Sequence, residues 1–319
     1  MVMAGRRLDA GEAENLEAYL KCRPADLTAR TELLGYCSRH DSRGKSARES
    51  KAKHVLLLIR NSPEAEVLGL PYGQFTPLLE PERDAQGKGA WLEQLKSEPE
   101  SLPVLGDSAA SFLLKDQELA RVSLQKARAL DMRNPKWPAA LGQLYGLDMT
   151  KGAPEAKLAA ATKALEQLEI AYELTTDAEL RSLHLAYIAK ATFAANKPDR
   201  AKQAAEKMLR DIDESDGAGH VTHHGNTILG RVALLAGNVG KAKEHLLRAG
   251  DIDGAPGLRT FGPNMALAKD LLEKGEKAVV LEYLKLCGEF WEMGEARLAE
   301  WTAAIRAGKA PDFGANLHY

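Results

Sequence analysis

The feature that most limits how this chain can fold is the near absence of strand-like alternation between apolar and polar residues. Apolar residues recur instead at the three- and four-residue spacing of a helix face along almost the whole sequence. Short turns such as Asn196-Lys197-Pro198-Asp199 and Gly237-Asn238 separate these helical segments. The sequence therefore predicts an all-α protein.

The N-terminal part of the chain differs in composition from the rest. Pro71, Pro77 and Pro81, with several glycines, predict mainly irregular structure between residues 62 and 87. From about residue 104 the chain becomes rich in Ala and Leu. Before that point we expect helices at 10–23, 25–39, 47–60 and 89–97. We predict an N-terminal helical region at 1–100, helical repeats at 101–294, and a C-terminal capping helix with a docked tail at 295–319.

Small residues recur at fixed spacing in the Ala-rich part. A small residue is followed 12 positions later by another, then by an apolar residue after four more and a compact one after three more. Two antiparallel helices can approach closely only where both present small side chains, while the apolar residues fill the contact with the next hairpin. Four sets follow this pattern: Ser108, Ala120, Leu124 and Ala127; Ala189, Ala201, Ala205 and Met208; Gly230, Ala242, Leu246 and Ala249; and Ala268, Val280, Leu284 and Cys287.

One of these units resembles the tetratricopeptide repeat. The match consists of Leu229-Gly230, Ala233, the turn at 237–238, Ala242 and Ala249. Trp137, Leu141, Gly142 and Tyr145 resemble the opening of a further unit, although the insertion at 151–163 displaces its second helix. The resemblance covers about residues 104 to 291, and the segments 223–226 and 261–265 are similar to uncharacterised bacterial proteins of this type.

The resemblance implies a right-handed α-solenoid of stacked helical hairpins. In such a stack the first helix of each hairpin lines a concave face that binds another polypeptide. The resemblance therefore implies a scaffold or protein-interaction function. A purely structural subunit of a larger assembly is an open alternative, and the sequence does not determine the oligomeric state.

The concave face implied by the resemblance would carry three cations at matching positions. Lys190, Arg231 and Lys269 each follow the small residue of a first helix, and they are 41 and 38 residues apart. We predict that they bind a protein or peptide, and an acidic segment would suit them because bonds between charged groups are strong. The alternative is that they are solvated charges on an exposed helix face. The predicted partner-binding residues also include Gln143, Phe193, His224 and Met265.

The charge balance and the cysteines exclude several classes of function. The chain has 43 Lys and Arg residues against 45 Asp and Glu residues, so we expect no nucleic-acid partner. Cys22, Cys37 and Cys287 lie far apart without a CxxC pair, which argues against a zinc site built from thiolates and against a disulfide framework. We predict a chain with no cofactor.

A histidine cluster offers the only candidate for chemistry. His220, His223 and His224 are spaced so that two imidazoles could share a zinc ion, but the glutamate of an HExxH motif is missing. No nucleophile elbow and no phosphate-binding loop is present. We therefore predict no catalytic residues, no metal site and no enzyme. The alternative is a metal-dependent hydrolase or metal-binding protein that uses this cluster.

Location is weakly determined by the sequence. No apolar run approaches the roughly 20 residues of a membrane-spanning helix. No signal peptide is visible at the N-terminus, so the cytoplasm is the default expectation, and an exported mature form stays open. The large apolar residues Phe313, Leu317 and Tyr319 predict a tail that docks on the protein, either as a cap over an apolar end or in the concave face.

Overall fold

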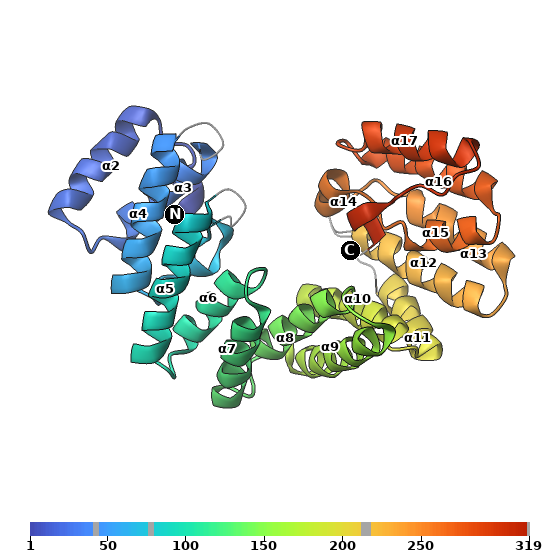
Figure 1. The fold of residues 1–319 in the computed structure, drawn as a ribbon, viewed down its shortest axis with the longest axis horizontal. Coiled ribbons are helices and arrows are strands. Elements are labelled where there is room, and N and C mark those ends of the chain that lie inside the picture. Colours follow the sequence, from blue (N-terminus) through green and yellow to red (C-terminus); the bar gives the residue numbers. More distant parts are fainter. Residues whose placement is uncertain (41–44, 76–79, 212–217, 318–319) are drawn as a thin grey trace. The chain divides into compact units, whose positions relative to one another are not determined.

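The computed structural model describes residues 1–40, 45–75, 80–211 and 218–317. These residues form seventeen α-helices and three short 3-10 helices, with no strand among them (Figure 1). Helices that follow one another along the chain pack against each other in most cases. The all-α fold class is therefore confirmed. No helix in the described part of the chain is long and apolar enough to cross a membrane.

The chain divides into two compact units, Met1–Trp137 and Pro138–Tyr319. The sequence predicts a boundary near residue 100. Helix α6 packs on α5 and on the first 3-10 helix, and α7 packs on α6, so this hairpin belongs to the first unit. The last helix and the tail belong to the second unit.

The first unit contains seven of the α-helices. Helix α5 begins earlier than the predicted start at Gly89, because Pro81 occupies its first turn, where its fixed φ fits and no N–H is needed. The elements are α1 (Val2–Gly5), α2 (Ala10–Cys22), α3 (Leu27–His40), α4 (Lys45–Asn61), η1 (Glu66–Gly69), η2 (Pro71–Gly73), α5 (Pro81–Ser97), α6 (Leu102–Phe112) and α7 (Gln117–Leu130).

The second unit contains the other helices, and α8 begins at the boundary between the units. First helices of successive hairpins pack on each other, as α10 does on α12 and α12 on α15. The elements are α8 (Lys136–Asp148), α9 (Pro154–Leu174), α10 (Ala178–Ala194), α11 (Pro198–Arg210), α12 (Ala218–Leu235), α13 (Val239–Gly250), α14 (Pro256–Phe261), α15 (Ala266–Glu273), α16 (Lys277–Phe290), α17 (Glu295–Arg306) and η3 (Gly314–Leu317).

Three hairpin turns of the second unit have the same backbone geometry. Asn196, Gly237 and Gly275 all have positive φ, at 55°, 78° and 84°. In each turn the residue after the positive-φ position donates its N–H to the carbonyl five residues earlier. Lys197 donates to Thr192 in the first turn and Asn238 donates to Ala233 in the second, and the third turn has the equivalent bond. This is the Schellman ending of a helix. The three hairpins α10/α11, α12/α13 and α15/α16 are therefore repeats of one local structure.

The small residues that define the repeat lie inside these hairpins. All members of the four sets are buried. Gly230 shows why size matters, because a Cβ at this position would lie 2.2 Å from the side chain of Leu267 and 3.2 Å from that of His245. Helices α12, α13 and α15 thus meet at a point where only glycine fits without displacement.

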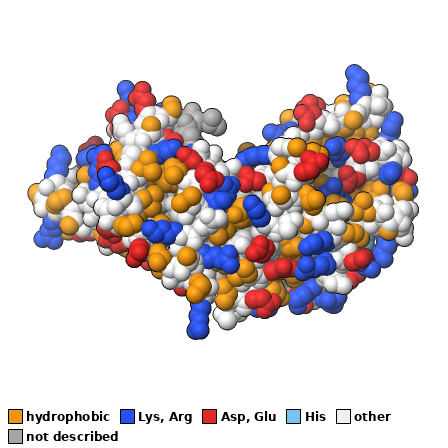
Figure 2. All heavy atoms as spheres, turned by 60° about the horizontal axis from the view of Figure 1, so that its bottom comes forward, with side chains coloured by type: hydrophobic (Ala, Val, Ile, Leu, Met, Phe, Trp, Pro, Cys, Tyr) orange, Lys and Arg blue, Asp and Glu red, His pale blue; other side chains and the backbone are white. Residues whose placement is uncertain are grey.

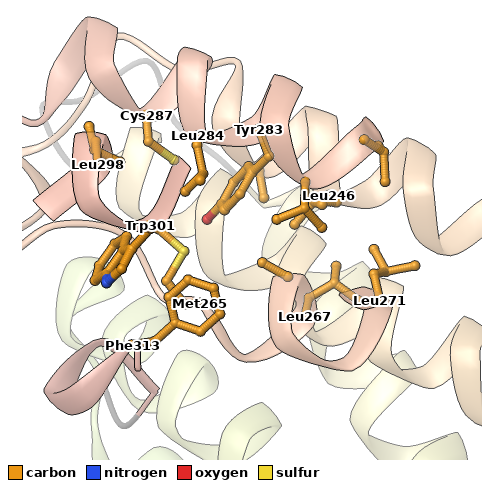
Figure 3. Close-up of a cluster of buried hydrophobic side chains, with 14 of the residues drawn as sticks. Leu246, Met265, Leu267, Leu271, Tyr283, Leu284, Cys287, Leu298, Trp301 and Phe313 are labelled. Atoms are coloured by element: carbon orange, nitrogen blue, oxygen red, sulfur yellow. The ribbon is translucent and has the colours of Figure 1, made fainter. Parts of the chain in front are cut away.

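The C-terminal tail packs against α17 and the segment before α15. Phe313 is buried, with its ring 5.0 Å from that of Trp301 (Figure 3). The Asn316 side chain donates to the carbonyls of Phe261 and Pro263, and the Asn316 carbonyl accepts from the N–H of Met265. The predicted tail residue Tyr319 lies outside the described residues.

Candidate functional site

Four of the predicted partner-binding residues come together on two neighbouring helices of the second unit. Lys190 and Phe193 lie on α10, and His224 and Arg231 lie on α12, which packs against α10. Each of these side chains is partly exposed. Gln143 is exposed on α8. The surface that these four side chains form on α10 and α12 is therefore the candidate site.

Arg231 connects three helices. Its guanidinium lies 4.5 Å from the centre of the Phe193 ring on α10, and its Nε donates to Asp270 Oδ2 on α15 at 2.7 Å. A cation over an aromatic ring and a charge-assisted hydrogen bond both hold the side chain in place. The carboxylate of Asp270 also compensates the Arg231 charge.

The other two cations are not equivalent to Arg231. Lys269 on α15 is 52% exposed, and its Nζ lies 3.8 Å from Glu273 Oε1, the distance of a weak surface ion pair. Lys190 is half-buried, and burial lowers the pKa of its ammonium group. The three cations thus differ in exposure, and the predicted column does not present three similar charges.

The prediction for Met265 needs correction. Met265 is fully buried beside Trp301 and Phe313, so its side chain offers no surface to a partner (Figure 3). Met265 lies four residues before Lys269, so helical spacing places the two on the same face. The helical count itself holds, because the Lys269 N–H donates to the Met265 carbonyl at the start of α15, but α17 and the C-terminal tail cover the Met265 side chain.

His223 has a structural role. Its buried ring lies between two backbone groups: Nδ1 is 2.8 Å from the Ala249 carbonyl, and Nε2 is 2.8 Å from the Asn264 N–H. Because a carbonyl only accepts and an amide N–H only donates, the neutral ring carries its proton on Nδ1. Burial lowers the pKa of His223 to about 4. Both ring nitrogens are thus engaged, and neither is left to bind a metal ion.

His220 and His224 form a separate pair on α12. Their ring centres are 4.3 Å apart with the planes at 68°, and both side chains are partly exposed. Burial lowers both pKa values, and His223, His220 and Lys190 lower that of His224 further. In the described part of the chain, no group of three or more His, Cys, Asp or Glu side chains is placed to hold a metal ion.

The sequence analysis missed a row of exposed apolar residues on α10. Leu180, Leu183 and Tyr187 are 48%, 37% and 36% exposed, and their spacing of three and four residues places them on one helix face. The same spacing continues to Lys190. The signal was present in the sequence, because α10 is apolar on more than the one face that its hairpin partners can cover.

The sequence analysis also missed a polar cluster in the first unit. Buried Arg30 donates to His54 Nδ1 at 2.6 Å, and His54 Nε2 donates to Glu17 Oε1 at 2.9 Å. Ser50 also donates to this carboxylate. Burial alone would raise the pKa of Glu17, but the hydrogen bonds from Ser50 and His54 and the positive charge of Lys53 lower it to about 2. This cluster joins α2, α3 and α4.

Charges of both signs are mixed on the face of the molecule that Figure 2 shows. Figure 2 shows one face on which Lys and Arg side chains alternate with Asp and Glu and with apolar atoms. This face carries no broad basic patch of the kind that binds nucleic acid. No protein-family model matches the chain, and no curated protein sequence is significantly similar to it.

Proposed function

We propose that this chain is a tetratricopeptide-like, right-handed α-solenoid protein that binds a protein or peptide and does not catalyse a reaction. The repeated hairpins of the second unit support this proposal, because they share turn geometry, buried small residues and packing between first helices. A cytoplasmic location is part of the proposal.

The observation that carries the proposal is the exposed row on α10. Leu180, Leu183 and Tyr187 form a contiguous apolar face that ends at Lys190 and lies on the helix that packs against α12. We call these four residues the α10 row. Apolar residues scattered singly on a surface need no explanation, whereas a row at helical spacing is the kind of surface that another polypeptide covers.

The partner that suits this row is an amphipathic, acidic peptide. Its apolar side chains would contact the leucines and the tyrosine, and its carboxylates would lie near the ammonium group of Lys190. The charges of Arg231 and Lys269 contribute less, because Asp270 and Glu273 lie beside them. The apolar preference, which the leucines and the tyrosine carry, is therefore stronger than the acidic one.

A displayed library of 12-residue peptides selected against the full chain would test this function. The affinity of a selected peptide would then be measured by fluorescence anisotropy for the wild type and for the double variant Leu183→Ala, Tyr187→Ala. The matched control is Leu158→Ala, since Leu158 on α9 is 45% exposed and lies outside the row. We expect a loss of about tenfold or more in the double variant and less than about twofold in the control. Equal affinities in all three proteins, or a selection that yields no binder, would contradict the proposal.

A further inference from the structure

A cavity lies in the first unit where two neighbouring helices begin. Helices α4 and α5 pack side by side (Figure 1), and residues from the start of each line a cavity of about 340 Å³. Sites for small molecules have volumes in this range. The lining side chains are those of Lys45, Arg48, Glu80, Glu82 and Arg83. Because Lys45 and Glu82 are exposed, a ligand can enter from solvent.

The Glu80 carboxylate has one oxygen that the protein does not satisfy. The side chain is 3% exposed, and its Oε1 accepts from Arg83 Nη1 at 2.6 Å. Its Oε2 is buried and has no hydrogen-bond partner among the residues that the structure describes. Glu80 directly precedes α5, yet its side chain caps none of the N–H groups of that helix. A buried acceptor without a donor is unfavourable, so a donor inside the cavity would stabilise this oxygen.

The guanidinium group of Arg48 on α4 lacks an acceptor. Its Nε is buried and bonds to no group in the described part of the chain. Arg48 and Glu80 line the same cavity, but the free nitrogen of one does not reach the free oxygen of the other. A ligand between them could satisfy both. The guanidinium group presents its N–H donors in a planar fork that matches the two oxygens of a carboxylate.

The two other cations at the cavity have acidic neighbours. Arg83 bonds to Glu80, and its Nη2 lies 4.0 Å from Glu49 Oε1. Lys45 Nζ lies 3.8 Å from the same oxygen of Glu49. The groups left for a ligand are therefore the Arg48 guanidinium and one oxygen of Glu80. A simple anion would leave the oxygen without a donor, and a simple cation would leave the guanidinium without an acceptor.

We propose that Arg48 and Glu80 form a binding site for a free α-amino acid. The Arg48 guanidinium binds the carboxylate of the ligand, and the ammonium group of the ligand donates to Glu80 Oε2. The N-terminal ends of α4 and α5 carry partial positive charge, which adds to the attraction for the ligand's carboxylate. The site lies in the first unit and shares no residue with the α10 row, so it is independent of the proposed function.

Isothermal titration calorimetry of the full chain with the common L-amino acids tests this site. We expect at least one of them to bind saturably, with one site per chain. The best ligand is then compared with its analogue that lacks the ammonium group and with its analogue that lacks the carboxylate. For alanine these analogues are propionate and ethylamine. Each should bind about tenfold or more weakly than the amino acid, because each leaves one buried group of the protein unpaired.

Two variants with matched controls locate the bound amino acid. Glu80→Gln removes the charge of the carboxylate and nearly keeps its size, and Arg48→Gln removes the guanidinium group. The controls are Glu93→Gln on α5 and Arg60→Gln on α4, at exposed positions that do not line the cavity. We expect binding to weaken about tenfold or more in the first two variants and less than about twofold in the controls. Melting curves show whether each variant is folded.

Three results would overturn the amino-acid site. The first is that no amino acid binds, which would mean that water alone fills the cavity. The second is that the analogue without the ammonium group binds as tightly as the amino acid, which would make this a simple anion site. The third is unchanged affinity in a folded Glu80→Gln or Arg48→Gln variant, which would place the ligand elsewhere. The comparison of analogues uses the wild type, so it decides the question even if neither variant folds.

Discussion

Helices α2, α3 and α4 of the first unit meet around charged side chains, whereas α12, α13 and α15 of the second unit meet around Gly230, Ala268 and a neutral histidine. His54 bridges the Glu17 carboxylate and the Arg30 guanidinium. The stability of the first unit therefore depends on the compensation of charges that are largely buried. The second unit depends on the close approach of helix backbones. The two units should therefore respond differently to changes of charge and of volume.

The largest effect should come from removing the carboxylate of the first unit. Glu17→Leu leaves the His54 donor unpaired and Arg30 buried without compensation, so it should destabilise the first unit by about 3 to 5 kcal/mol. Urea unfolding followed by amide hydrogen exchange should show the loss in α2 to α4 only. The control Glu14→Leu, at an exposed position of α2, should change stability little. An equal loss of stability in the two variants would contradict the role assigned to this cluster.

The pH dependence of the first unit sharpens the same comparison. Because the pKa of folded Glu17 is lowered to about 2 from 4.5, its contribution is fully present above pH 4.5 and is lost as the pH falls through 2. Urea midpoints between pH 5 and pH 2 should therefore fall more steeply in the wild type than in Glu17→Gln. Parallel curves for the two proteins would contradict this assignment.

The contribution of Asp107 in α6 to stability should depend on pH with the opposite sign. Burial raises the pKa of its carboxyl to about 6 from 3.8, against the opposing charge of Lys136. The folded state therefore holds this proton more tightly than the unfolded state, and stability is lost as the pH rises from 3.8 through 6. Asp107→Asn should stabilise the first unit by about 2 to 3 kcal/mol at pH 7 and by about 0.5 kcal/mol at pH 4. Urea unfolding at the two pH values checks this, and an equal effect at both would contradict it.

Volume should matter more in the second unit. Gly230→Ala places a methyl group against Leu267 and should cost about 1 to 3 kcal/mol through overpacking. The control Gly240→Ala, in the first turn of α13, meets only the Asn238 side chain at 3.8 Å and should be neutral or stabilise by up to about 1 kcal/mol. Thermal melting of both variants distinguishes them. A neutral Gly230→Ala would show that α12 and α15 can separate without cost.

The smallest effects concern the predicted cations. Lys269→Ala should change the free energy of unfolding by less than about 0.5 kcal/mol, because its ion pair with Glu273 is exposed. Arg231→Ala removes contacts with both Phe193 and Asp270 and should cost about 1 to 2 kcal/mol. Urea midpoints of the two variants measure the difference. Similar values would mean that Arg231 is as loosely held as Lys269.

The pattern of small residues was the part of the fold that the sequence could predict. Ala189, Gly230 and Ala268 are buried at equivalent places because close helix packing acts directly on residue size, which a sequence displays. Pro81 predicts irregular structure from the sequence, yet it starts α5, because the same fixed φ suits a loop and a first helical turn.

The side-chain partners of the site could not be predicted in this way. Asp270 reaches Arg231 across two helices, and nothing in the spacing of the cations shows that an acid will lie beside one of them. Met265 illustrates the other limit, because α17 and the C-terminal tail, which are distant in the sequence, cover a position that helical spacing alone places on the surface. The three apolar residues of the α10 row are present in the sequence at helical spacing, but that spacing does not show which of them stay exposed in the fold.

The most direct test of the account is amide hydrogen exchange of the full chain with and without a selected peptide. The account predicts added protection confined to α10 and α12 of the second unit, and its loss in Leu183→Ala, Tyr187→Ala. Protection located in α11 and α13, or in the first unit, would contradict the account, because it would place the partner on surfaces other than the α10 row.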